Sequence, residues 1–498
     1  MVALAGAVAL VALVPVAYLV IRAGDGGWGP VADTLFLDRT GRLLVRSLGL
    51  AAAVTAASAV IGIALAWLTV RCDLPGRRAW QVVAALPLAM PSYVAAFAYV
   101  STFPDLTGFP GAFLVLTVLS YPYVFLPVAA ALERLDPSLE EAARSLGDGP
   151  GRAFVRVTLR QLRPSAATGS LLVCLYVLSD FGAVSLLRFD TFTRVIYQSY
   201  RSSFDRRPSA VLGCLLLVFT LAILVAEARS RGRARYYSAG GGARRKPPLV
   251  RLGRSRWVAL AVPVGVAGLA LVLPLVTSVR WFLESVQASI DAGRVWRAAR
   301  GSLVASAFGA GLTAVAAVPV ALLAARWRTR AAAVIERSAY IGHALPGIVV
   351  ALSLVFFTVR FLNPLYQRLP VLVFAYLVLF LPLAVSSIYG SALQAPPALE
   401  EVARSLGRRP WSVFRSVTAP LIAPGVAAGT ALVFLTCLKE LPATLLLGPT
   451  GYETLSTRVW SATSTGAYGD AALPALLLVV VAAVPTWLLS RRISSSLP

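Results

Sequence analysis

The stretch LEEAARSLGDGPGRAFVRVTLRQLRP at residues 139–164 decides how this chain is organised, because residues 399–424 repeat it as LEEVARSLGRRPWSVFRSVTAPLIAP. Half of the positions are identical at this offset of 260 residues. The identical pairs include Glu140/Glu400, Glu141/Glu401 and Gly147/Gly407. Both copies are polar stretches in an otherwise apolar chain. A polar module repeated inside a repeated hydrophobic body indicates two equivalent docking points on one membrane protein.

Composition places the rest of the chain in a membrane. The 498 residues are 58% hydrophobic and 14% charged, whereas a soluble domain carries about 25% charged residues. Long apolar runs approach the roughly 20 residues that span a bilayer as a helix. The predicted fold class is therefore an all-α polytopic membrane protein with about twelve transmembrane helices. The expected runs are 2–21, 46–70, 79–101, 112–133, 166–187, 209–228, 257–279, 302–325, 337–359, 371–393, 425–447 and 471–490.

The net charge of +24 first suggests a nucleic-acid partner, but the arginines follow membrane topology instead. If Met1 lies inside, the loops on that side hold most of the arginines, which is the positive-inside pattern. This predicts a multi-pass protein with both termini in the cytoplasm and no nucleic-acid partner. Only two lysines stand against the many arginines, and together with the alanine richness this is associated with GC-rich bacterial genomes. The expected location is a bacterial cell (inner or plasma) membrane.

The chain divides at residues 229–256, a Gly-, Arg- and Pro-rich stretch without apolar periodicity that we interpret as a cytoplasmic linker. A solvated tether is favoured over a contact with anionic lipid or a partner. The predicted domains are a first half at 1–228 with its module at 136–165, and a second half at 257–498 with its module at 396–425. Six spans on each side give both halves the same orientation, which predicts a pseudo-two-fold axis along the membrane normal.

Each module is expected to be a helix, a glycine turn and a second helix. In the first copy the helix starts near Pro137 and ends at Gly147, and the second helix runs from Pro150 to Pro164. The equivalent residues of the second copy are Pro397, Gly407, Pro410 and Pro424. A small apolar face flanked by glutamates suits a groove on another protein, where the carboxylates would pair. The alternative is an ordinary interfacial amphipathic loop, which two copies at half identity disfavour.

The modules resemble the EAA signature of binding-protein-dependent ABC importer permeases, with Val402 in place of the usual alanine. The resemblance covers essentially the whole chain and implies two permease halves fused head to tail. It also implies coupling helices that dock two copies of a P-loop ATPase subunit, and an extracytoplasmic substrate-binding protein that delivers the substrate. The implied docking residues are Glu140, Glu141, Ala142, Gly147, Glu400, Glu401, Ala403 and Gly407.

Two further stretches resemble the iron(III)-importer permeases, namely residues 180–184 with 190–192, and residues 439–447. They imply ferric iron as the substrate. Thiamine, polyamine and phosphonate permeases have similar layouts, so these substrates remain alternatives. A secondary transporter driven by an ion gradient is a further alternative, although it would not need a repeated docking module.

Asp180 and Glu440 occupy equivalent places in their expected spans. Ionisable groups inside a span cost about 2.5–3.5 kcal/mol and usually face a pathway or a partner. Together with Lys439, they are candidates for the translocation pathway. The alternative is structural, with Lys439 neutralising a carboxylate on a neighbouring helix and Asp180 capping a broken helix at Gly182.

Residues 188–208 are expected outside, yet this loop holds five arginines and two aspartates and so breaks the positive-inside pattern. Arg201, Arg206 and Arg207 are candidates for contacts with acidic residues of the external binding protein. Contact with lipid headgroups is the alternative.

Motifs for catalysis are missing from the sequence. There is no Gly-x-x-x-x-Gly-Lys-Ser/Thr phosphate-binding loop, so ATP hydrolysis must be supplied by a partner. The single histidine excludes a multi-histidine metal site within the chain, and no nucleophile–base constellation is visible. We therefore expect a non-enzymatic translocation subunit with no cofactor and no metal site.

Overall fold

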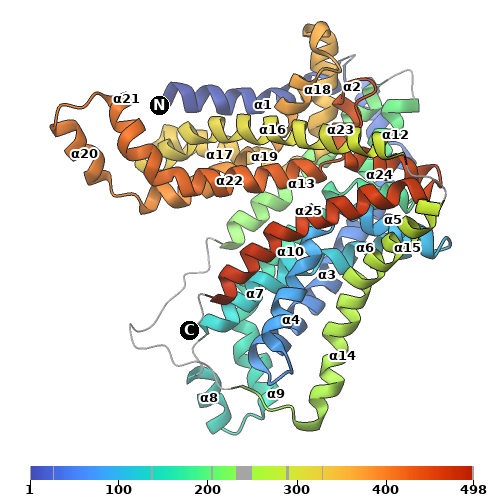
Figure 1. Cartoon of the computed structure of the whole chain (residues 1–498), viewed down its shortest axis with the longest axis vertical. Coiled ribbons are helices and arrows are strands. Elements are labelled where there is room, and N and C mark those ends of the chain that lie inside the picture. Colours follow the sequence, from blue (N-terminus) through green and yellow to red (C-terminus); the bar gives the residue numbers. More distant parts are fainter. Residues whose placement is uncertain are drawn as a thin grey trace. The chain divides into compact units, whose positions relative to one another are not determined.

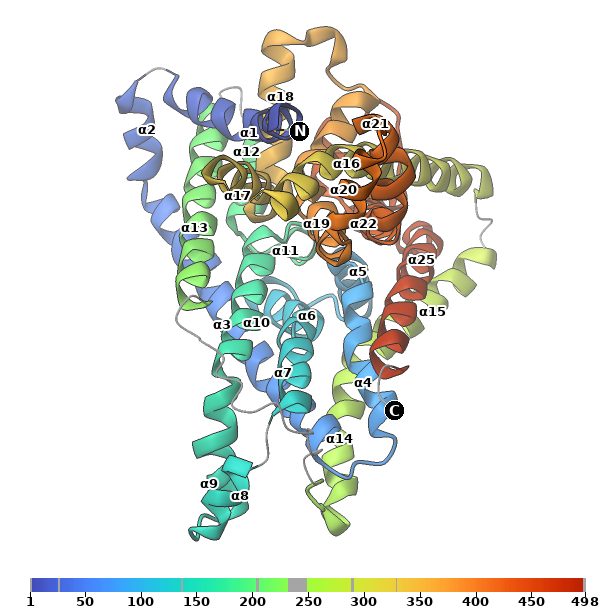
Figure 2. The same cartoon turned by 90° about the vertical axis from the view of Figure 1, so that its left-hand side faces the viewer.

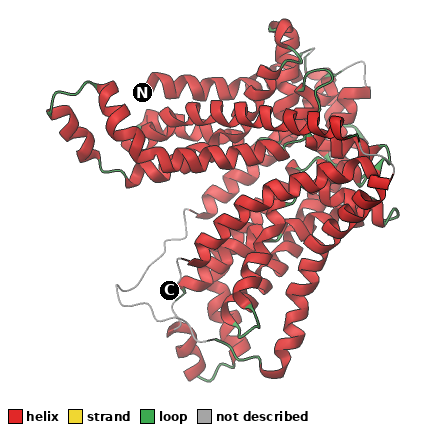
Figure 3. Ribbon diagram, viewed as in Figure 1, coloured by secondary structure: helices red, strands yellow, loops and turns green. Residues whose placement is uncertain are grey.

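The computed structural model of the chain describes residues 2–25, 27–135, 138–202, 206–231, 249–287, 291–327 and 329–495. In these ranges the regular structure is helical, apart from one isolated parallel bridge between Cys72 and Val250 (Figure 3). The predicted all-α fold class is therefore confirmed. Residues 136–137 of the first module and 232–248 of the predicted linker lie outside the described residues.

The helices belong to two compact units. Unit 1 comprises Met1–Thr40, Val195–Leu217 and Ile290–Ser461, and unit 2 comprises Gly41–Arg194, Val218–Ser289 and Ala462–Pro498. Each unit therefore takes helices from both sequence halves. Unit 1 consists mainly of the second half but includes α1 (Val2–Gly24). Unit 2 consists mainly of the first half but includes α14 (Arg256–Ala267), α15 (Leu273–Gln287) and α25 (Tyr468–Ser495).

Unit 1 is organised around three mutually packed helices, α16 (Ala292–Arg326), α19 (Leu369–Gln394) and α22 (Ala419–Lys439). Helix α1 packs on α16 and on α17 (Arg330–Ala344) and α18 (Gly347–Phe361) (Figure 1). The other described helical elements of this unit are α2 (Trp28–Leu35), α12 (Phe192–Ser202), the start of α13 (Arg207–Arg231), η5 (Asn363–Leu365), α20 (Pro397–Ser405), α21 (Pro410–Val413), η6 (Phe414–Thr418), α23 (Pro442–Leu447) and α24 (Leu455–Ser464).

Unit 2 contains a close pair of helices, α7 (Pro122–Arg134) and α10 (Leu159–Ser179). Gly169 of α10 permits this contact, because a Cβ there would lie 2.6 Å from the carbonyl oxygen of Tyr123. Helix α15 packs on α25 and on α5 (Ser92–Thr102). The other described helical elements of this unit are α3 (Asp38–Arg71), α4 (Arg77–Ala85), η1 (Leu86–Ala89), α6 (Gly108–Ser120), α8 (Ser138–Ser145), α9 (Pro150–Ala153), η2 (Phe154–Thr158), α11 (Gly182–Leu186), η3 (Gly253–Ser255) and η4 (Gly268–Val272) (Figure 2).

Nine helices among the described residues are long and apolar enough to cross a membrane, and each overlaps one of the twelve expected runs. The three other expected runs fall on shorter or bent helices. One is the pair Arg77–Ala89 and Ser92–Thr102, which meet at an angle of 91°, and the others are Gly347–Phe361 and Tyr468–Ala483. The count of twelve therefore stays a prediction.

Two expected spans end earlier than the apolar pattern indicates. The run at 166–187 breaks after Ser179 and the run at 425–447 breaks after Lys439. The next residue is extended in both cases, with φ −66° and ψ 130° at Asp180 and φ −70° and ψ 129° at Glu440. Hydropathy does not reveal these breaks because the residues beyond them are again apolar.

The second helix of each module also differs from the prediction. Helical residues continue without interruption from Pro150 through α9 and η2 to the end of α10, past Pro164. The prediction of an end at Pro164 was therefore wrong. A proline is tolerated within such a helix when neighbouring groups satisfy the freed backbone carbonyl.

Candidate functional site

The repeated modules fold as two short helices around a left-handed glycine. Helices α8 and α20 are followed by Gly147 with φ 97° and Gly407 with φ 78°. The amide of Asp148 donates to the carbonyl oxygen of Ala143 at 3.1 Å, which closes the helix end. The predicted glycine turns are confirmed. The modules lie at the ends of the membrane helices that follow them, as Figures 1 and 2 show for α20 and α8.

Glu140 points inward, toward the chain's own membrane helix. Its Oε2 accepts from Arg71 Nη2 at 2.8 Å and from the hydroxyl of Thr158 at 2.9 Å. Arg71 is the last residue of α3, and its side chain is only 5% exposed against 13% for Glu140. Thr158 is fully buried. One carboxylate thus joins the end of α3 to both helices of the first module.

The second module repeats this arrangement residue for residue. Glu400 Oε1 accepts from Arg326 Nη2 at 2.9 Å and from the hydroxyl of Thr418 at 3.2 Å. Arg326 is the last residue of α16 and also donates to the carbonyl oxygen of Ala395 at 2.9 Å. The side chains of Arg326 and Glu400 are 11% and 18% exposed. We call these two networks the Arg–Glu–Thr clamps.

The outward face of each module is apolar with one carboxylate. Leu146 is 88% exposed and Leu406 is 75% exposed. Glu141 and Glu401 are also exposed, unlike the clamp glutamates that precede them. The other exposed apolar residues of the two short helices are Leu139, Ala142, Leu399 and Val402. Ala403 is buried, so the two alanines predicted to dock do not have equivalent environments.

Asp180 and Glu440 cap the short helices that follow them. Asp180 Oδ1 accepts from the amides of Ala183 at 3.0 Å and Val184 at 3.3 Å. Glu440 accepts from the amide of Ala443 at 2.8 Å through Oε1 and from that of Thr444 at 3.0 Å through Oε2. Both side chains are buried. Helix capping is the structural alternative that the sequence suggested for Asp180, and Glu440 has the same role.

The backbone at both caps is held by a second repeated bond, which sequence reasoning missed. Thr193 donates to the carbonyl oxygen of Asp180 at 2.6 Å, and Ser456 donates to that of Glu440 at 3.0 Å. Lys439 is the last residue of α22 and is half-buried. Within the described residues, no group of three or more His, Cys, Asp and Glu side chains is placed to hold a metal ion.

The three candidate arginines of the loop lie on α12 and at the start of α13. Arg201 and Arg206 are exposed, and their guanidinium carbons lie 5.9 Å and 4.8 Å from the ring centroids of Tyr197 and Tyr200. Arg207 begins α13 and is half-buried. Arg201 Nη1 also donates to the hydroxyl of Tyr197 at 3.4 Å.

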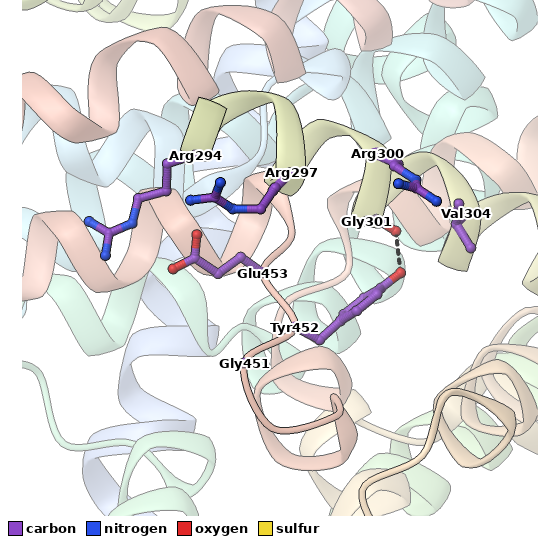
Figure 4. Close-up of a pocket in the computed structure, with 8 residues that line it drawn as sticks. All are labelled: Arg294, Arg297, Arg300, Gly301, Val304, Gly451, Tyr452 and Glu453. Carbon is purple, nitrogen blue, oxygen red and sulfur yellow. Dashed lines mark hydrogen bonds between the residues drawn. The ribbon is translucent and has the colours of Figure 1, made fainter. Parts of the chain in front are cut away.

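Unit 1 also contains a basic pocket of about 490 Å³. Arg294, Arg297 and Arg300 of α16 line one side, and Gly451–Glu453 line the other (Figure 4). The hydroxyl of Tyr452 donates to the carbonyl oxygen of Gly301 at 2.5 Å. Burial raises the pKa of this phenol, so it stays a neutral donor. The sequence alone does not reveal the pocket, because its two sides lie about 150 residues apart.

This pocket and the second clamp lie near opposite ends of helix α16. The pocket begins at Arg294 and the clamp lies at Arg326, near the two ends of one 35-residue helix. At a rise of 1.5 Å per residue, Arg300 and Arg326 are separated by about 39 Å, more than the hydrocarbon core of about 30 Å. The basic pocket and the second module therefore lie near opposite ends of one helix of membrane-spanning length in unit 1.

Comparison with known proteins agrees with this architecture. The family described as binding-protein-dependent transport system inner membrane component matches residues 58–235 and again residues 317–493. The chain belongs to this family. The double match confirms that two homologous permease halves are fused in one chain. The predicted resemblance to the iron(III) permeases is also confirmed at the level of sequence similarity, because this inner membrane component is similar to the Fe(3+)-transport system permease protein FbpB 2 of Haemophilus influenzae.

The extent of similarity to this chain differs among its relatives. FbpB 2 is 36% identical over 482 residues, which cover 96% of this chain and 95% of the relative. The sulfate transport system permease protein CysT of Salmonella typhimurium is 30% identical over 36% of the chain and 69% of the relative. The molybdenum transport system permease protein ModB of Escherichia coli is 34% identical over 24% of the chain and 60% of the relative.

Proposed function

We propose that this chain is the permease subunit of an ATP-driven ABC importer that carries ferric iron delivered by an external binding protein. The observation that carries the proposal is the duplicated module, anchored in both halves by the same clamp and exposing the same apolar face. Ferric iron is favoured because the similarity to FbpB 2 extends over almost the full length of both chains. Thiamine, polyamines and phosphonate are the alternative substrates, and an ion-gradient-driven transporter is disfavoured by membership of a binding-protein-dependent family.

Two P-loop ATPase subunits would bind, one on each module. Leu146 and Leu406 offer apolar contact area, and Glu141 and Glu401 offer exposed carboxylates for cationic groups of the ATPase. Glu140, Glu400, Gly147 and Gly407 support docking by holding the module's shape. Ala142 is exposed on the first module, whereas Ala403 is buried on the second.

The proposal is tested by purifying the chain with its P-loop ATPase and replacing Leu146 and Leu406 by Glu. Both side chains are exposed, so the variant should fold and insert normally while ATPase binding weakens at least tenfold. The control is Phe36→Glu, which changes an equally exposed residue just before the opposite end of α3. If the wild-type chain transports without any ATPase, the importer proposal is wrong.

The substrate is tested in liposomes that contain the complete complex. ATP-dependent uptake of ferric iron from the loaded binding protein is expected, and sulfate or molybdate should not compete. Coupled ATP hydrolysis stimulated only by a differently loaded binding protein would show that iron is the wrong substrate while leaving the importer class intact.

The binding protein would contact the outward arginines. Arg201 and Arg206 together with the basic pocket form a positive surface for acidic residues of that protein, and Arg207 belongs to the same loop. Reversing Arg294 and Arg297 to Glu should lower the association rate of the binding protein and its stimulation of ATP hydrolysis, most strongly at low salt. Unchanged association at low salt would exclude the pocket as a contact surface.

The proposed membrane topology is that of a binding-protein-dependent permease with two fused halves. We place twelve spans, both termini in the cytoplasm and the pseudo-two-fold axis along the normal of the bacterial inner membrane. The two sequence halves at 1–228 and 257–498, joined by the linker at 229–256, are the homologous repeats. The positive-inside distribution of arginines supports this orientation, as does the need for both modules to reach cytoplasmic ATPases.

Asp180, Lys439 and Glu440 stay candidates for the translocation pathway. The capping bonds of Asp180 and Glu440 favour a structural role, because a carboxylate that already accepts two backbone hydrogen bonds has less capacity for a passing cation. The neutral amide substitutions Asp180→Asn and Glu440→Gln distinguish the two roles, because they remove the charge and keep a cap acceptor.

A further inference from the structure

We infer that Arg71 and Arg326 are positioning residues that fix the two coupling modules to α3 and α16, so that movement of a docked ATPase is transmitted to these membrane helices. The inference rests on the proposed function of the modules as ATPase docking sites. It concerns how force enters the membrane domain rather than where the partner binds.

The modules need such an attachment because they have little packing of their own. Helix α8 has no buried residue, and α20 buries only Ala403. A helix that exposes most of its surface can tilt freely unless directed bonds hold it. In each module the clamp supplies those bonds, through one carboxylate oxygen that accepts from an arginine and from a threonine.

The clamp joins three separate elements at one point. Glu140 lies on the docking helix, Thr158 lies where the next membrane helix begins, and Arg71 ends α3. The same three places are occupied by Glu400, Thr418 and Arg326 in the other half. A displacement of α8 or α20 must therefore move α3 or α16, or break a largely buried charged bond.

Both helices that receive this displacement extend far across the membrane. Helix α3 has 34 residues and α16 has 35 residues. Each therefore extends for about 50 Å at 1.5 Å per residue. The far end of α16 lines the basic pocket, so the second clamp lies on a direct mechanical connection between the docking face and the outward face of unit 1.

Adjacent glutamates in each module have different roles, one in positioning the module and the next in binding the ATPase. Glu140 and Glu400 are turned into the clamps, whereas Glu141 and Glu401 are exposed. Loss of a clamp should therefore leave the docking surface chemically unchanged. Loss of Glu141 and Glu401 should instead weaken ATPase binding and leave the attachment intact.

The test compares two double variants. In one, Arg71 and Arg326 are both replaced by Met, and in the other both are replaced by Lys. Lysine keeps the charge and one donor, although it lacks the planar fork. The control is Arg78→Met with Arg330→Met, which removes two exposed arginines near the same ends of the membrane helices. Each variant is purified with the ATPase and binding protein, and both ATP hydrolysis and substrate uptake are measured in liposomes.

The methionine pair should retain the ATPase in the complex but transport at least tenfold less substrate per ATP hydrolysed. The lysine pair should restore at least half of the wild-type ratio, and the control pair should match the wild type. The inference is wrong if the methionine pair transports with the wild-type ratio. It is also wrong if the methionine and lysine pairs are equally impaired and equally less heat-stable, since that identifies a purely structural bond. Failure of the wild-type chain to bind any ATPase would instead reject the proposed function.

Discussion

Asp180 and Glu440 could act as helix caps or line the translocation pathway, and substitutions distinguish these two roles. Each caps a short helix through two backbone amides. Replacing both by Ala should lower the free energy of unfolding by about 0.5–2 kcal/mol per cap. Asn at position 180 keeps the single acceptor oxygen that Asp180 uses, whereas Gln at position 440 keeps only one of the two that Glu440 uses. The thermal midpoint of this uncharged pair in detergent should therefore fall less than that of the Ala pair, and the uptake rate should stay close to the wild type.

The variant with Asp180→Asn and Glu440→Gln can also contradict a purely structural role for these carboxylates. If Asp180→Asn with Glu440→Gln keeps its thermal midpoint but transports at least tenfold less, the carboxylate charge itself is needed. That result would favour the pathway role expected from intramembrane charges. Uptake measured on the same purified samples as the thermal midpoint distinguishes the two cases.

The short helix of each module and its glycine turn form the element on which the proposed recognition of the ATPase depends. Gly147 and Gly407 adopt left-handed φ values, and an added Cβ at either position would meet no atom within 4 Å. The cost of substitution therefore comes from the backbone alone, about 1–2 kcal/mol for a left-handed residue. Gly147→Val with Gly407→Val should distort the turn and weaken ATPase co-purification several-fold, whereas the Asn pair should be tolerated. Equal binding by the Val and Asn pairs would show that the turn does not control the docking face.

This element also shows what the sequence could and could not predict. The helix and its glycine turn follow from local chemistry, and the repeat reveals that the module matters. The inward direction of Glu140 depends on Arg71, which lies 69 residues away and reaches it only in the folded chain. The breaks at Asp180 and Glu440 were also hidden, because apolar residues continue beyond them and hydropathy alone does not distinguish a straight span from a broken one.

At the scale of the whole molecule, each compact unit is assembled from both sequence halves. Helix α1 buries Ala5, Ala9, Ala12, Pro15 and Leu19 in the unit that holds most of the second half. Helices α14 and α15 belong to the unit that holds most of the first half. The repeat in the sequence could not predict this exchange, because an apolar helix face does not specify which bundle it joins. In a bilayer that choice is made by close packing rather than by hydrophobicity.

The exchange predicts how a divided chain should behave. If residues 1–240 and 241–498 are produced as separate polypeptides, neither piece contains all the helices of a unit, since α1 is in the first piece and α14, α15 and α25 are in the second. Produced together, the two pieces should co-purify in detergent as a one-to-one complex and restore uptake, whereas either piece alone should be degraded or aggregate. Size-exclusion chromatography of tagged pieces measures this. Two stable, separate pieces that do not associate would contradict the exchange, because each half would then complete its own bundle.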